Sequence, residues 1–161
     1  MSRDLFSTLE QTLLRKLEGL DRLIVLAGQN RDALVASDVD AIVLANEQQT
    51  SELSRLDRLQ RSSARLLNEL ASSLGLEDRG ATLKSVAAAL PEQQRQRLAG
   101  LSEDLQNRAQ QLAFAAELNA TLSTNALDFI QFSLQTISRA VAEAQPERGV
   151  ANPSLVLDVQ A

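Results

Sequence analysis

Catalytic and metal-binding chemistry has few candidate side chains in this sequence of 161 residues. The chain contains no Cys, His, Tyr or Trp. Disulfide bridges, thiolate metal sites, and Ser-His or Cys-His nucleophile pairs are therefore excluded, as are the Glu-x-x-His sites of di-metal helix bundles. Carboxylates remain, but their spacing does not indicate a catalytic or metal site. We therefore expect no enzyme, no metal and no cofactor, and the candidate chemistry is recognition by apolar surfaces.

Residues 114–141 carry the clearest recognition pattern. At about 100° per residue their apolar side chains form two faces roughly 140° apart, where an ordinary surface helix needs only one. Three of the four phenylalanines lie on the first face. Its members, called the phenylalanine face below, are the predicted partner-binding residues: Phe114, Leu118, Leu122, Asn125, Phe129 and Phe132.

The second face, called the isoleucine stripe, consists of Leu127, Ile130, Leu134, Ile137 and Val141. The same line along the predicted helix continues toward the N-terminus through Leu98, Leu101, Leu105, Leu112 and Ala116. Asn119 and Ser123 interrupt this line, and a polar residue at such a position can fix helix register. We therefore expect the isoleucine stripe to be buried within a helical bundle. Two interpretations stay open for the phenylalanine face: an exposed partner site, or contact with another helix of the same bundle.

Three arginines form a basic ridge on the second predicted helix. Arg58, Arg61 and Arg65 lie within about 60° of one another on that helix. The ridge is either a solvated surface or a docking strip for an acidic partner. Nucleic acid is not an expected partner, because no aromatic residues interleave with these arginines and the net charge is −5.

The elements that position these faces are long helices. Leucines recur at spacings of three and four through residues 4–36, where Glu18 and Arg22 form a favourable i,i+4 pair. Ser37 and Asp40 resemble a capping box, so a second helix is expected to begin there and to end before Gly75, which suits the left-handed position after a last turn. Such a short link predicts an antiparallel hairpin.

The remainder of the chain predicts a short helix in residues 82–90 and one long final helix. Pro91 fits the first turn of that helix, Gly100 is the one position where it is expected to kink or break, and Pro146 ends it by residue 145. We expect an all-α fold: a hairpin, a connector helix and a long C-terminal helix in an elongated, coiled-coil-like three-helix bundle. Residues 1–144 would form one domain, and residues 145–161 a flexible tail.

The composition also bears on location. No run of residues approaches the 18 apolar positions of a membrane span, and the polar N-terminal segment is not typical of a signal peptide. We expect a cytoplasmic protein without membrane insertion.

Specific short motifs follow one another in residues 31–67: Ala33-Leu34, Asp38, Ala41-Ile42 and Arg65-Leu66-Leu67. In this order they resemble the first hairpin of FlgN-type flagellar export chaperones. The long final helix, with Asn119 and Asn125 ahead of an apolar run, is also similar to the last helix of that family. The resemblance extends over roughly residues 5–141.

The resemblance implies a cytoplasmic chaperone of type III flagellar export. Such a chaperone takes up C-terminal helical segments of hook-filament junction proteins on its last helix, prevents their premature assembly, and delivers them to export gate and ATPase components. The family often has a Tyr ahead of a Gly after the last helix; Gly149 is present here, but no Tyr is. The alternative is a non-catalytic coiled-coil structural module that oligomerises through the phenylalanine face, which makes a second copy of the chain a further candidate partner.

Overall fold

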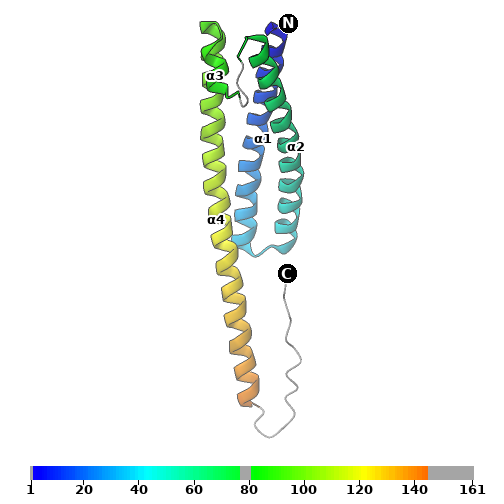
Figure 1. The fold of residues 1–161 in the computed structure, drawn as a ribbon. Coiled ribbons are helices and arrows are strands. Elements are labelled where there is room, and N and C mark those ends of the chain that lie inside the picture. Colours follow the sequence, from blue (N-terminus) through cyan, green and yellow to red (C-terminus); the bar gives the residue numbers. More distant parts are fainter. Residues whose placement is uncertain (1, 77–80, 145–161) are drawn as a thin grey trace. The chain divides into compact units, whose positions relative to one another are not determined.

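The computed structural model describes residues 2–76 and 81–144 and contains four helices in these ranges, with no strand among them. They are α1 (Ser2–Ala36), α2 (Val39–Ser73), α3 (Leu83–Ala88) and α4 (Glu92–Ala144) (Figure 1). The predicted all-α class is confirmed. The chain divides into two compact units, Met1–Leu122 and Ser123–Ala161, and α4 contributes residues to both.

The turn between α1 and α2 differs in detail from the sequence prediction. Ser37 has a φ of 54°, in the left-handed region, and is not the N-cap. Asp38 is the N-cap of α2, and its carboxylate accepts a hydrogen bond from the backbone N–H of Ala41 at 3.1 Å. The predicted Ser37–Asp40 capping box is therefore wrong by one residue. Asp is as good an N-cap as Ser, so the segment offered two candidates that propensity does not separate.

The two long helices α1 and α2 lie side by side and antiparallel, as the short link predicts (Figure 1). The Ser2 hydroxyl near the start of α1 donates to the Ser73 hydroxyl at the end of α2, at 3.2 Å. Near the turn, the Asn30 amide donates to Asn46 Oδ1 at 3.4 Å. Midway along the pair, Gly19 lets the helices approach closely, because a Cβ at that position would lie 2.7 Å from Leu56 Cδ2.

Local signals define the connections that follow α2. Gly75 adopts a φ of 73°, as predicted, and the Leu76 N–H donates to the Ala71 carbonyl at 3.0 Å. This 6→1 bond satisfies a carbonyl that the helix end would leave unpaired. A reciprocal capping box between Thr82 and Ser85 starts α3. The long helix α4 begins just after Pro91 and passes through Gly100 without a break.

The hydrophobic core of the first unit lies where the start of α1, the end of α2, the connector helix α3 and the start of α4 come together. Leu9, Leu70 and Val86 have no exposed surface, and Leu98 of α4 is 1% exposed. Fully burying one such side chain stabilises the fold by about 1.5–3 kcal/mol. Apolar burial therefore anchors this end of the first unit.

Contacts between α4 and α1 within the first unit set their relative direction. Arg97 pairs with Glu10 at 3.5 Å, and Arg108 pairs with Asp21 at 2.5 Å. Further along, the buried amide of Asn119 donates to the Ala27 carbonyl at 2.9 Å. Residue numbers rise together in all three pairs, so α4 runs parallel to α1. The polar interruption at Asn119 is thus satisfied by a hydrogen bond to the backbone of a neighbouring helix.

The described part of the second unit is the last portion of α4, which ends at Ala144 as Pro146 predicts. The expected flexible tail, residues 145–161, lies outside the described residues.

Candidate functional site

The phenylalanine face has members in both units, and each group is described separately. In the first unit, the Phe114 side chain is 70% exposed, whereas Leu118 and Leu122 are half-buried. In the second unit, Asn125 is exposed, and Phe129 and Phe132 are 69% and 67% exposed. Large aromatic side chains at this exposure are characteristic of interaction sites.

The isoleucine stripe is exposed as well. Its five members, all in the second unit, are each between 52% and 60% exposed. The predicted burial of this stripe in the bundle is therefore wrong, although Leu98, earlier on the same line, is buried. Helix length supplies the reason: α4 has 53 residues and spans about 80 Å, whereas α1 and α2 have 35 each and span about 52 Å. A hairpin of that length does not cover all of α4.

The exposed apolar residues of the second unit therefore occupy two sides of one helix. Its charged residues, Asp128, Arg139 and Glu143, lie by helical arithmetic on the side nearer to the phenylalanine face. That face thus combines two aromatic anchors with a mixed-charge border. Apolar anchors of this kind suit the binding of an amphipathic helix, with polar groups at the rim setting its orientation.

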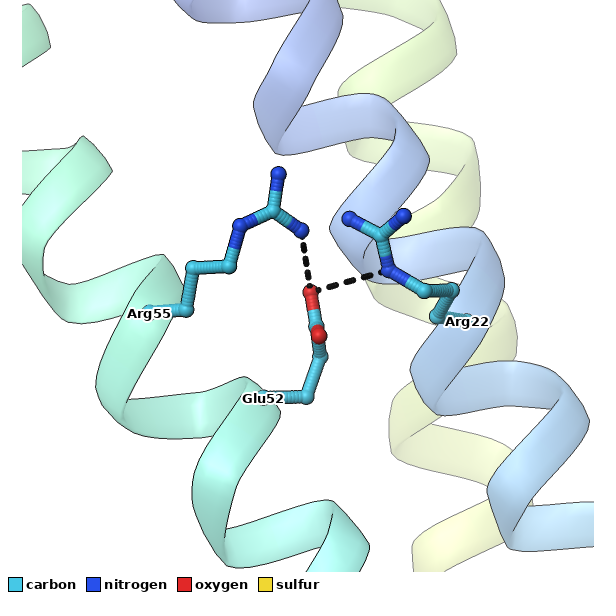
Figure 2. Close-up of polar contacts among 3 residues, drawn as sticks. All are labelled: Arg22, Glu52 and Arg55. Carbon is cyan, nitrogen blue, oxygen red and sulfur yellow. Dashed lines mark hydrogen bonds and ion pairs between the residues drawn. The ribbon is translucent and has the colours of Figure 1, made fainter.

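A charged cluster links α1 and α2 (Figure 2). Glu52 Oε1 accepts from Arg22 Nε at 3.2 Å and from Arg55 Nη1 at 2.9 Å, and the Glu52 side chain is only 14% exposed. The predicted Glu18–Arg22 pair is not among the ion pairs of the described residues, because Arg22 turns to the partner across the hairpin instead. Sequence spacing along one helix could not have revealed this partner.

The arginine ridge is exposed on α2. Arg61 pairs with Asp57 at 3.0 Å and Arg65 with Glu69 at 3.5 Å, so two of its three charges have an acidic partner one turn away on the same helix. Arg58 is exposed as well. The arrangement suits a solvated surface, and docking of an acidic partner there stays a prediction.

The described residues contain no cluster of three or more acidic side chains placed to hold a metal ion. Burial lowers the pKa of Lys16, whose ammonium donates to Gln60 Oε1 at 2.5 Å. In the part of the chain that the structure describes, no helix has the length and apolarity needed to cross a membrane.

These features define a class: a helical binding protein, with a core at one end of a long hairpin and exposed apolar faces on its last helix. The chain belongs to the FlgN family, whose model, described as FlgN protein, matches residues 1–145. This confirms the resemblance seen in the sequence and supports a general role as a flagellar export chaperone. No curated protein and no solved structure matches the chain.

Proposed function

We propose that this protein is a cytoplasmic chaperone of type III flagellar export whose clients are hook-filament junction proteins. The phenylalanine face binds a C-terminal helical segment of the client, keeps it from assembling before secretion, and the complex is then delivered to the export gate. The observation that carries this proposal is the high exposure of Phe129 and Phe132 in a chain that belongs to the FlgN family.

The binding mode we propose is that of a helix laid against an apolar face. A client helix presents apolar anchors at i, i+3, i+4 and i+7, which match the spacing of Phe129 and Phe132. Covering these aromatic rings removes apolar surface from water on both partners, which supplies the driving force for association. The same coverage hides the client's own assembly surface, which is how a binding protein prevents premature polymerisation.

Phe114 is the corresponding anchor in the first unit, where it is exposed, while Leu118 and Leu122 keep part of their surface accessible. We assign these residues and Asn125 to the client contact as well. An Asn beside aromatic anchors offers both a donor and an acceptor to a client helix.

The test is calorimetric titration of purified hook-filament junction proteins into the wild-type chain and into a variant with Leu122→Ala, Phe129→Ala and Phe132→Ala. Truncation of central interface anchors typically costs about 2 kcal/mol or more each, and 1.4 kcal/mol is a tenfold change in affinity. Even if these costs are not additive, we expect client affinity to fall by at least about 100-fold.

The matched control replaces three exposed apolar residues of α1 by alanine: Leu14, Val25 and Val35. This variant removes exposed apolar surface on another helix and should bind the client normally. Equal client affinity of the wild type and of the triple variant Leu122→Ala, Phe129→Ala and Phe132→Ala would reject the site. A tight homodimer formed through the phenylalanine face that persists with client bound would instead favour the structural-module alternative.

Delivery requires a surface that the client does not occupy. The arginine ridge of Arg58, Arg61 and Arg65 is exposed and cationic, and we propose it as the contact for an acidic surface of the export gate or ATPase components. Replacing all three by Gln should leave client affinity unchanged and reduce client secretion. Secretion at the wild-type level would remove this assignment.

A further inference from the structure

The isoleucine stripe is a second apolar surface, which the proposed client site does not use. Its members follow one another at intervals of three, four, three and four residues, from Leu127 to Val141. This is the a/d spacing of a coiled coil, and it is maintained over two heptads. All five side chains are more than half exposed. The second unit therefore presents one side of a coiled coil without its partner helix.

The flanks of the stripe carry no charge. The residues at the heptad e and g positions beside it are Ala126, Gln131, Ser133, Ser138 and Ala140. The charged residues of this segment lie roughly 140° or more from the centre of the stripe by helical arithmetic. Because e and g charges normally determine which helices pair and in which direction, uncharged flanks allow two identical helices to pair without repulsion.

The stripe is nearly symmetrical about Leu134. Apolar members lie four and seven residues before it, and three and seven residues after it. An isologous two-fold interface brings the same residues of two copies together, so a stripe with this symmetry is self-complementary. Residues 145–161 contain Pro146 and Pro153 and carry no second heptad pattern of that length. The exposed stripe is therefore available to a helix of another molecule.

We propose that the isoleucine stripe is a self-association surface, which pairs with the same stripe of a second copy of this chain in a two-fold helix pair centred on Leu134. Two heptads are fewer than a stable coiled coil usually has, so the dimer is weak and its population rises with protein concentration. Self-association and client binding use different sides of the helix. The proposal stands on the exposure and spacing of the stripe and does not depend on the proposed function.

Disulfide trapping tests this pairing cleanly, because the natural chain has no cysteine. In Leu134→Cys the new thiols of two copies face each other, whereas in Thr136→Cys the thiol lies roughly 160° away on the same helical turn. We expect mild oxidation to convert Leu134→Cys into a covalent dimer and to leave Thr136→Cys mostly monomeric. Adding Ile130→Asp and Ile137→Asp to Leu134→Cys should abolish the covalent dimer.

Sedimentation of the unmodified chain provides a second measurement. Its average mass should rise toward that of a dimer with concentration, and the Ile130→Asp, Ile137→Asp variant should stay monomeric. Both substituted residues are exposed, so far-UV circular dichroism should report an unchanged helix content. Should the Asp variant lose helix, Ile130→Gln with Ile137→Gln provides the same comparison without charge. A monomeric wild type at all concentrations, or equal trapping of the two cysteine variants, would overturn the proposal.

Client titrations separate this proposal from the proposed function. The Ile130→Asp, Ile137→Asp variant should bind client with wild-type affinity, and Phe129→Ala with Phe132→Ala should leave trapping through Leu134→Cys unchanged. If saturating client prevents trapping, the two surfaces are not separate and the inference fails. Trapping that persists while the phenylalanine substitutions leave client affinity intact would reject only the client site.

Discussion

Two glycines of the same helix should respond differently to replacement by alanine. Glycine inside a helix costs about 0.8–1.0 kcal/mol relative to alanine, so helix propensity predicts a gain at both Gly19 and Gly28. At Gly28 a new Cβ would meet no atom within 4 Å. At Gly19 it would lie 2.7 Å from Leu56 Cδ2 and 3.0 Å from Glu52 Oε1, and the Glu52 carboxylate is held by two arginines (Figure 2).

The expected magnitudes follow from these distances. Gly28→Ala should raise the free energy of unfolding by about 1 kcal/mol, the full propensity gain. Overpacking a helix interface typically costs about 1–3 kcal/mol, so Gly19→Ala should range from no net change to a loss of about 2 kcal/mol. The two variants should therefore differ by about 1–3 kcal/mol. In a chain of this size, each kcal/mol of that difference corresponds to a shift of about 2–4 °C in Tm.

Urea unfolding followed by far-UV circular dichroism is the suitable assay, because the chain has no Trp or Tyr to serve as an intrinsic fluorescence probe. The double variant Gly19→Ala, Leu56→Ala supplies the internal check. Trimming Leu56 makes room for the new methyl group, so its cost should be smaller in the Gly19→Ala background than in the wild type. Equal stabilisation by Gly19→Ala and Gly28→Ala would refute the close approach of α1 and α2 at this point.

Other substitutions test the core, the polar contact of α4 and the half-buried side chain of Lys16. Leu70→Ala in the fully buried core should lower the free energy of unfolding in urea by about 2–5 kcal/mol. Leu134→Ala on the exposed stripe should change it by less than about 0.5 kcal/mol at low protein concentration. Similar losses in the two variants would contradict the assigned burial. Asn119→Ala should cost about 1 kcal/mol, because its hydrogen bond to the Ala27 carbonyl is buried, and no loss would argue against that bond. Burial lowers the Lys16 pKa below its ordinary 10.5, so the unfolded chain binds more protons between the two values and stability should rise with pH there. Lys16→Met should be more stable at neutral pH and lack that rise in alkaline urea titrations, and a variant that keeps the rise would contradict the assignment to Lys16.

The four helices and most of their ends follow from local signals in the sequence. Apolar spacing sets the extent of the long helices, Gly75 supplies the left-handed residue that ends α2, and Pro146 limits α4. These signals are local, since they depend on backbone conformation and on neighbours within one or two turns. The phenylalanine face was found in the same way, because helical spacing places residues on one side whatever the rest of the fold does.

Which apolar surfaces are covered, and which ion pairs form between helices, depends on how the helices pack together. Periodicity assigns Leu98 and Ile137 to the same line, yet one is buried and the other exposed, because coverage depends on which helices lie alongside and how far they reach. Arg22 pairs across the hairpin with Glu52, and Gly19 lies against Leu56. The two residues of each pair are far apart in the sequence. Such contacts depend on how two helices are aligned, and no pattern within either helix specifies that alignment.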